Sequence, residues 1–479
     1  MSSIDPPAAS PPKRSATRAI GPGDIVSSGL CIGCGACVAH GPAGAQMRLD
    51  RYGQFKPHGP KDWRMADPDF ERLCPFSPLA PNEDELAGER FAGASHMDRR
   101  IGRFEAAYVG HVAETGFRMD GSSGGLVSWV AVELLRTGIV DGIVHAAPTD
   151  GGGSADGYFK YRISRSEREI RAGAKSRYHP VELSGVIAEM RARPGRYAVV
   201  GIPCMIKALH LAGRVDPLLA QRVTLTLGLF CGHMKSLRLV ESFAWQMGVR
   251  PETVRGVDYR LKRPDQPANW YVAELSLGDG GRRRRYWWDM ADGDWGAGFF
   301  QNQACDFCDD VVAETADISF GDAWVEPYSS DGRGTNVVIV RTGELNALLR
   351  AGTAEGRLEL AEVDADFVAR TQAAGLRHRR EGLAYRLQRF RGPVLPRKRV
   401  EPGDKGLSAR RKLIYAMRRQ IGRWSHRVFR LARLTRWPGL YLGWARAALS
   451  LYHGLAYGRG WLGSLLDRLG WSGMEGRDP

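Results

Sequence analysis

The stretch Val223-Thr224-Leu225-Thr226-Leu227-Gly228-Leu229-Phe230 consists almost entirely of β-branched and apolar residues, which predicts a buried interior strand. Residues 197–201 form a second run of this kind, and helical patterns occupy residues 125–136 and 181–191. Strands that alternate with helices usually form a sheet whose faces the helices cover. We therefore expect residues 104–360 to fold as an α/β body.

The composition of the chain changes on both sides of this body. The first residues are rich in Pro, Ser and Ala, the next segment holds four of the eight cysteines, and a polar stretch follows it. Short β-rich segments between residues 254 and 288 predict an antiparallel insertion within the body. The expected divisions are a disordered leader (1–24), a cysteine-rich module (25–80), a linker (81–100), the body (101–375) and a basic tail (376–479).

The formal net charge of +15 over 479 residues is concentrated at one end of the chain. From Arg377 onward there are 24 Lys and Arg against six Asp and Glu, whereas the preceding residues carry a net charge of −3. We therefore expect the body to carry the chemistry and the tail to determine location. The first ten residues contain no apolar segment typical of a signal peptide, which predicts a cytoplasmic protein. Clustered cysteines in that compartment indicate metal or redox chemistry rather than disulfides.

Cys31, Cys34 and Cys37 have the C-x2-C-x2-C spacing of a bacterial-type ferredoxin. The usual run ends in a fourth cysteine before a proline, but Gly41 occupies that position, and Cys74 precedes a proline further along. The three clustered cysteines with Cys74 supply four ligands for one 4Fe–4S cluster, and Gly41 removes the ligand that a second ferredoxin cluster would need. A structural zinc site is the alternative, although zinc ribbons usually show two C-x2-C pairs.

The other four cysteines come from three separate segments. Cys204 and Cys231 follow the two predicted interior strands, and Cys305 and Cys308 form a C-x2-C pair. Ligands of open α/β sheets collect at the carboxyl ends of the strands, so these cysteines are expected at that edge. Their residue types leave three alternatives open: a second cluster or zinc site, buried cysteines that act as small apolar residues, and a dithiol pair at Cys305 and Cys308.

A glycine-rich turn, Ser122-Ser123-Gly124-Gly125, precedes the apolar helical pattern that starts at Leu126. Free N–H groups at a helix N-terminus attract phosphate, and the serine hydroxyls can donate to it. The alternative is an ordinary helix cap formed by one of the serines. Lys175-Ser176-Arg177-Tyr178 adds basic and aromatic groups suited to a dinucleotide, with Lys175 and Tyr178 as candidate contacts; its alternative is a solvated turn.

Together these motifs resemble the beta subunit of coenzyme F-420 hydrogenase/dehydrogenase and its relatives, which include 7-hydroxymethyl chlorophyll a reductase. The resemblance extends over residues 28–345, and the N-terminal three-cysteine run is also typical of the family. The ordered motifs that carry it are Ser122-Ser123-Gly124-Gly125, Lys175-Ser176-Arg177-Tyr178, Gly201-Ile202-Pro203-Cys204, Cys305-Asp306-Phe307-Cys308-Asp309-Asp310 and Ala316-Asp317-Ile318-Ser319-Phe320-Gly321-Asp322-Ala323-Trp324.

The resemblance implies an enzyme, an oxidoreductase that depends on FAD and 4Fe–4S clusters. Its fold would be an α/β (α+β) flavin domain with an N-terminal ferredoxin-like iron–sulfur module, to which this chain adds its basic helical tail. FAD would contact the Ser122–Gly125 turn and Lys175, and the second cysteine set would hold a 4Fe–4S cluster. Electrons would pass between one or two clusters, FAD and a small-molecule acceptor, with ferredoxin or another redox partner protein as the carrier.

The sequence differs from the family pattern in two ways, and it does not decide which molecule is the acceptor. Gly41 leaves the N-terminal module with one cluster, and the basic tail is not part of the pattern. The acceptor could be a deazaflavin or another molecule, since relatives also occur in polysaccharide-related settings, and no side chain stands out as a catalytic acid or base. The alternative function is a non-catalytic, zinc-stabilised adaptor whose tail docks on a membrane or a partner protein.

The tail contains no acidic residue from Lys405 to Leu466, and apolar residues recur at helical spacing among arginines from Leu413 to Trp424. This pattern predicts a basic amphipathic helix. A transmembrane span is not expected at residues 437–457, because Arg446, Pro, Gly and His interrupt that stretch. We expect helices on the anionic inner face of the membrane, with packing on the body or on a partner as the alternative. Nucleic acid is not an expected partner, since no binding motif accompanies the charge.

Overall fold

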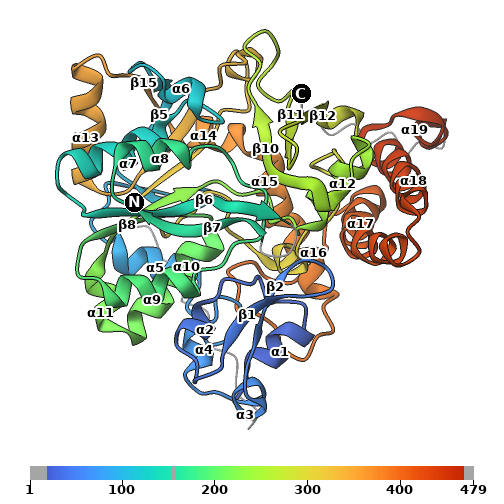
Figure 1. Cartoon of the computed structure of the whole chain (residues 1–479), viewed down its shortest axis with the longest axis horizontal. Helices are drawn as coiled ribbons and strands as arrows, with labels where there is room; N and C mark the ends of the chain where they lie inside the picture. The colour runs from blue at the N-terminus through green and yellow to red at the C-terminus, as the bar shows by residue number, and fades with distance from the viewer. Residues whose placement is uncertain (1–18, 154–156, 469–479) are drawn as a thin grey trace.

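The computed structural model describes residues 19–153 and 157–468, and a mixed sheet of eight strands forms its centre (Figure 1). The strands, in their order across the sheet, are β15 (Leu358–Val363), β5 (Ala106–Val112), β14 (Asn336–Val340), β13 (Ile318–Asp322), β9 (Val223–Leu229), β8 (Tyr197–Gly201), β6 (Gly142–Gly153) and β7 (Gly157–Ser164). Neighbours among β13, β9, β8 and β6 run parallel, and every other neighbouring pair is antiparallel. The fold is therefore mixed α/β, as the alternation of strands and helices predicted.

The strand β8 shows why its sequence is apolar at every position. Tyr197 and Val199 pack into the core on one face of the sheet, and Ala198 and Val200 pack into the core on the other. Helices cover both faces (Figure 1), so an interior strand has no solvent side. The covering helices are α7 (Leu126–Arg136), α8 (Glu167–Ala172) and α13 (Gly343–Ala354) on one face, and α9 (Ser184–Ala192), α10 (Pro203–Val215) and α11 (Pro217–Arg222) on the other.

A separate sheet confirms the predicted antiparallel insertion. Its three strands pair in the order β10 (Val254–Leu261), β11 (Val272–Leu277) and β12 (Arg282–Tyr286). On β12, Arg282 and Arg284 both pair with Glu274 of β11. Helix α12 (Arg238–Gln246) packs beside this sheet through a shared apolar core.

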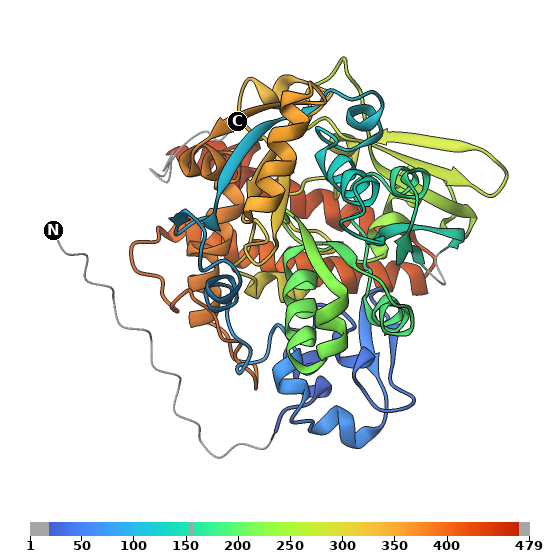
Figure 2. The same ribbon diagram turned by 90° about the vertical axis from the view of Figure 1, so that its left-hand side faces the viewer.

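The cysteine-rich N-terminal segment lies at one end of the molecule, as Figures 1 and 2 show in blue. The stretch expected to be a linker, 81–100, is more ordered than that word implies, because it holds a helix and a short strand. The elements up to residue 120 are α1 (Pro22–Ser27), α2 (Ala36–Ala39), β1 (Gln46–Leu49), β2 (Phe55–His58), α3 (Lys61–Met65), α4 (Phe70–Leu73), α5 (Glu83–Arg90), β3 (His96–Asp98), β4 (Gly102–Phe104) and α6 (Phe117–Asp120).

The tail is helical, as predicted, but its helices pack on the body. Phe429 stacks on Trp245 and meets the edge of Phe300, and Tyr441 and Tyr452 are buried in the same core. The body therefore covers the apolar faces of these helices, so packing on the body, the alternative to a membrane, is correct for these faces. No helix among residues 19–153 and 157–468 combines the length and apolar character needed to cross a bilayer. Helix α14 (Ala365–Thr371) still belongs to the body, and α15 (Ala373–Arg379) crosses into the tail. The tail continues with α16 (Glu381–Gln388), α17 (Ala409–Leu434), α18 (Pro438–Tyr457) and α19 (Gly460–Arg468).

Candidate functional site

The first cysteine set lines a single cavity in the N-terminal segment. Cys31 and Cys34 lie in the loop between α1 and α2, Cys37 is in α2, and Cys74 follows α4 directly. Gly33 between them has a φ of +82°, and a Cβ added there would lie 2.6 Å from the carbonyl oxygen of Phe55. Glycine therefore lets the loop curl tightly enough for the three thiols to face one point.

Burial makes three of these thiols, Cys34, Cys37 and Cys74, poor acids. It raises the pKa of Cys34 to about 12, with a contribution from Cys31, and raises the pKa values of Cys37 and Cys74 above the usual range. Bound metal reverses this balance, since a thiolate is the form that coordinates iron or zinc. Four thiols that face one apolar cavity are therefore suited to a cationic metal centre.

The second cysteine set lines another cavity. Cys204 lies in the first turn of α10, Cys231 comes shortly after β9, and Cys305 and Cys308 lie in and after the 3₁₀ helix η3 (Gln303–Phe307). Both interior strands thus deliver a cysteine at their carboxyl ends, as their positions in the sequence predicted. Cys305 and Cys308, in and just after η3, line the same cavity as Cys204 and Cys231.

Ile32 and Phe76 line both cavities, so only a thin layer of side chains separates the two cysteine sets. Burial raises the pKa of Cys204 well above its usual value, and Cys34 of the first set adds to this shift after the nearer cysteines.

All eight cysteines are free thiols. No group of three His, Cys, Asp or Glu residues in the described chain is compact enough for a single metal ion.

Arg379 places a buried positive charge beside the second set. Its guanidinium donates hydrogen bonds to the backbone carbonyl oxygens of Cys305, Cys231 and Gly232, and the side chain lines the cavity. Burial opposes this charge, but the three nearest thiols outweigh burial and raise the pKa of Arg379 above its usual value. An anionic centre at the four cysteines would be stabilised by this cation.

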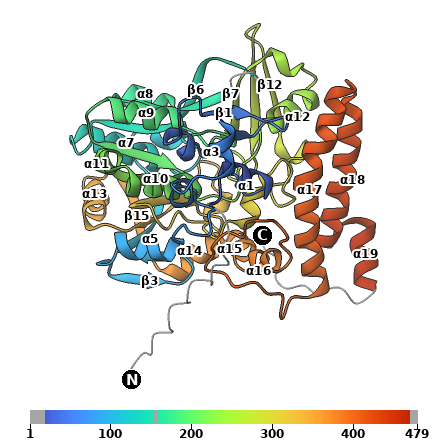
Figure 3. The same ribbon diagram turned by 90° about the horizontal axis from the view of Figure 1, so that it is seen from below.

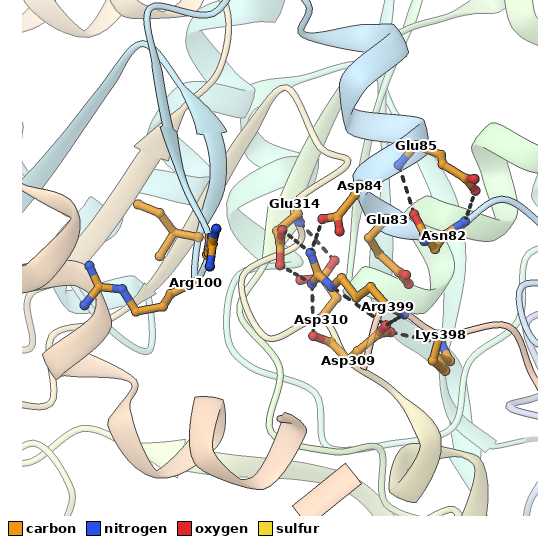
Figure 4. A network of polar contacts seen from close by, with 12 residues as sticks. Asn82, Glu83, Asp84, Glu85, Arg100, Asp309, Asp310, Glu314, Lys398 and Arg399 are labelled. Carbon is orange, nitrogen blue, oxygen red and sulfur yellow. Dashed lines mark hydrogen bonds and ion pairs between the residues drawn. The ribbon is translucent and has the colours of Figure 1, made fainter. Parts of the chain in front are cut away.

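A buried network follows the second C-x2-C pair directly (Figure 4). Lys398 Nζ donates to Asp309 Oδ1 at 2.9 Å, and Arg399 binds Glu314 and Asp84. Burial alone would raise the pKa of Asp309, but Lys398 and Arg399 lower it below its usual value. The basic tail therefore neutralises an acidic loop of the body, and it does not act only on location as the charge distribution suggested.

The glycine-rich turn lies between β5 and α7, and its serines are used inside the fold. Ser123 Oγ donates to the carbonyl oxygen of Thr335, and Ser122 Oγ accepts from the backbone N–H of Ser176. Neither serine caps α7, whose N-cap is Gly125 with a φ of +87°. A Cβ at Gly124 would lie 2.7 Å from the carbonyl oxygen of Gly110, so glycine allows the turn to approach β5.

Basic side chains gather around this turn. Lys262 Nζ donates to the carbonyl oxygens of Ser123 and Arg118, and Lys175 lies 3.4 Å from Asp258. Burial and, after it, the neighbouring cations Lys175, Arg260 and Arg118 together lower the pKa of Lys262 to about 7. Such a concentration of cations is suited to a phosphate-bearing ligand.

Tyr178 belongs to a buried aromatic cluster rather than to the turn. Its ring lies 4.7 Å from that of Trp295 and 5.7 Å from that of Trp287, centroid to centroid. Trp295 in turn stacks on His233 at 4.2 Å, two residues beyond Cys231. The cluster therefore leads from Tyr178 towards the second cysteine set.

The sequence did not point to Arg379, Lys398, Arg399, Lys262 or Trp295. Arg379 is 74 residues from Cys305, and no local pattern links the two. The basic pair at Lys398 and Arg399 does match the acidic pair that follows Cys308, and this complementarity was the one available signal. Nothing in the sequence distinguished Arg379 from the other arginines of the tail.

Two sequence models of one family match the chain. The model described as "Coenzyme F420 hydrogenase/dehydrogenase, beta subunit N-term" matches residues 107–188, and the model of the C-terminal part of the same beta subunit matches residues 195–366. Together they span more than half of the chain, and they leave out the first cysteine set and the tail beyond residue 366.

No curated protein matches the chain. One similar solved structure is described as "Xenon derivatization of the F420-reducing [NiFe] hydrogenase complex from Methanosarcina barkeri", with 17% sequence identity and a TM-score of 0.48 over 64% of this chain and 99% of that chain. Because both sequence models match, the chain belongs to the coenzyme F420 hydrogenase/dehydrogenase beta-subunit family and is an oxidoreductase of the electron-transferring kind.

Proposed function

We propose that this oxidoreductase passes electrons between two 4Fe–4S clusters, FAD and a small-molecule acceptor. The observation that carries the proposal is the arrangement of all eight cysteines around two adjacent cavities, four on each. A 4Fe–4S cluster takes four cysteine thiolates, so each set has the right number and kind of donor. When bound, the clusters supply one-electron transfer and FAD supplies hydride transfer.

The chain's own residues would hold and tune these groups. Cys31, Cys34, Cys37 and Cys74 would ligate one cluster, and Cys204, Cys231, Cys305 and Cys308 the other. Mostly apolar side chains would surround both clusters, and Arg379 would offset negative charge at the second. Ile32 and Phe76 separate the two sites by little more than a side chain, which favours electron exchange between them.

FAD is proposed to lie at the glycine-rich turn of residues 122–125. Lys175 and Lys262 would attract its phosphates, and Tyr178 would line the side towards the second cysteine set. In this proposal the ferredoxin-like module spans residues 25–80 and the flavin domain residues 101–375, with Arg379 added from the tail. Electrons would enter from ferredoxin or another redox partner protein, and the acceptor would be deazaflavin-like or another hydride acceptor. The eight free thiols support the prediction of a cytoplasmic protein.

Anaerobic purification followed by iron, sulfide, flavin and zinc assays tests this proposal. We expect a brown protein with a visible spectrum of iron–sulfur and flavin chromophores, reducible by dithionite or reduced ferredoxin. Transfer of those electrons to added candidate acceptors then identifies the acceptor class. A colourless protein with stoichiometric zinc would contradict the proposal and support the adaptor alternative.

A further inference from the structure

The outer surface of the tail combines exposed apolar residues with arginines at one place, the end of the α17–α18 hairpin. Helices α17 and α18 stand side by side along one edge of the molecule (Figure 3). At the turn between them, Leu431, Leu434 and Trp437 are 51%, 69% and 62% exposed. These are among the most exposed large apolar side chains of the described chain, although the inner faces of the same helices are fully packed.

Cations surround these apolar side chains. Arg427, Arg430, Arg433 and Arg436 are all exposed, and of these Arg433 pairs with Glu241. Within residues 19–153 and 157–468, neither Arg430 nor Arg436 forms an ion pair with a carboxylate. The tail itself offers none, since it has no acidic residue from Lys405 to Leu466.

Arg436 also has a backbone conformation that a glycine would adopt more easily. Its φ is +54°, in the left-handed region where helices usually place Gly after their last turn. A non-glycine residue is strained in this conformation because its Cβ crowds the backbone. The hairpin therefore keeps a cation at its end despite a local cost in stability.

We propose that the end of the α17–α18 hairpin binds the surface of an anionic lipid bilayer. Leu431, Leu434 and Trp437 would enter the interfacial region, where tryptophan is favoured, and the arginines would contact the acidic headgroups. A membrane suits this site better than a protein partner because the site is a helix turn with exposed apolar side chains at its end and exposed arginines around them. The inference replaces the expectation of whole helices lying on the membrane, and it is independent of the proposed cofactors.

Vesicle flotation of the purified full-length chain tests the proposal. We expect binding to phosphatidylcholine vesicles that contain phosphatidylglycerol, little binding to phosphatidylcholine alone, and weaker binding at high salt. The double substitution Leu434→Ser/Trp437→Ser should weaken binding about ten-fold or more. Arg436→Gly should weaken it about five-fold without loss of thermal stability, because it removes both a charge and the unfavourable conformation.

Two exposed tryptophans outside the tail provide the matched control. Trp270→Ser/Trp288→Ser removes side chains of similar exposure from another part of the surface and should leave binding unchanged. Failure of the wild type to bind anionic vesicles, or equal binding by the hairpin variants, would overturn the proposal. A dimer in solution that is lost in Leu434→Ser/Trp437→Ser, without vesicle binding, would instead assign this surface to contact between copies.

Discussion

Arg379 donates a hydrogen bond to the backbone carbonyl oxygen of Cys305, at 3.3 Å, and so joins the basic tail to the cysteine-lined cavity of the body. Its side chain is only 1% exposed. The division suggested by charge alone, with chemistry in the body and location in the tail, is therefore wrong at this point. A tail residue contributes to the electrostatics of the candidate cluster site.

Arg379→Gln should lower the reduction potential of the second cluster, because reduction adds negative charge and the nearby cation stabilises it. One charge at an effective dielectric constant of about 20 corresponds to a shift on the order of 50–100 mV. A redox titration followed by electron paramagnetic resonance measures the shift. Arg283→Gln, which removes an exposed arginine from β12, should leave both cluster potentials unchanged. Equal potentials in wild type and Arg379→Gln would show that this cation does not act on the cluster.

Lys398→Met should destabilise the protein strongly, because Lys398 and Asp309 form an ion pair with side chains only 3% and 0% exposed. The loss should lie somewhat below the roughly 3–5 kcal/mol of a fully uncompensated buried charge, because Arg399 still lies 3.7 Å from Asp309. Urea unfolding measures the loss. Arg389→Met, which breaks the exposed pair with Asp404, should cost about 1 kcal/mol or less.

The pH dependence of the same pair has a definite sign. The pKa of Asp309 is lowered in the folded protein, so its contribution to stability is present above its unfolded pKa, about 3.9, and is lost as the pH falls towards the folded value. The deficit of Lys398→Met should be largest near neutral pH and shrink on acidification, because protonation then neutralises Asp309, which has lost its nearer cation. A deficit that does not depend on pH would indicate lost packing rather than lost charge pairing.

Phe429→Ala should destabilise the protein by about 3–5 kcal/mol, because its ring is fully buried between Trp245, Phe300 and Tyr441. Leu431→Ala, two residues further along α17 and half exposed, should change stability by less than about 0.5 kcal/mol. Thermal unfolding of the two variants compares them directly. Similar small effects of both would contradict the packing of α17 on the body.

Lys262→Gln should weaken FAD binding about ten-fold or more, since hydrogen bonds to charged groups contribute about 1.5–3 kcal/mol. Burial and the neighbouring cations together lower the pKa of Lys262 to about 7, and bound phosphate would favour its charged form. FAD should therefore bind the wild type more tightly as the pH falls through about 7, and this dependence should disappear in the variant. Fluorescence titration of FAD at several pH values measures both effects. The exposed Lys160→Gln is the control, and an unchanged pH dependence would separate Lys262 from the flavin site.

The sequence predicted the parts of the fold that depend on local pattern. The strand at residues 197–201 has the predicted bounds and is buried at every position, which is why its pattern was clear. The strand at residues 223–229 ends one residue earlier than predicted, and its central residues 225–228 are buried. Cys204 and Cys231 lie at the expected edge of the sheet because parallel strands bring their carboxyl ends together.

The rest depends on contacts between residues far apart in the chain. Lys398 meets Asp309 across 89 residues, and neither has a local pattern that identifies the other. The amphipathic pattern of α17 predicted a helix with an apolar face but could not say whether lipid or the body covers it. The order of β14, β5 and β15 in the sheet likewise follows from pairings that local periodicity does not encode.

The central claim is that each cysteine set holds its own 4Fe–4S cluster. Iron analysis and electron paramagnetic resonance of anaerobically purified Cys34→Ser and Cys204→Ser variants, beside the wild type, test it most directly. We predict about eight iron atoms per wild-type chain and about four in each variant, with a different reduced-cluster signal lost in each. Loss of the same signal from both variants, or a wild type with about four iron atoms or fewer, would contradict the claim.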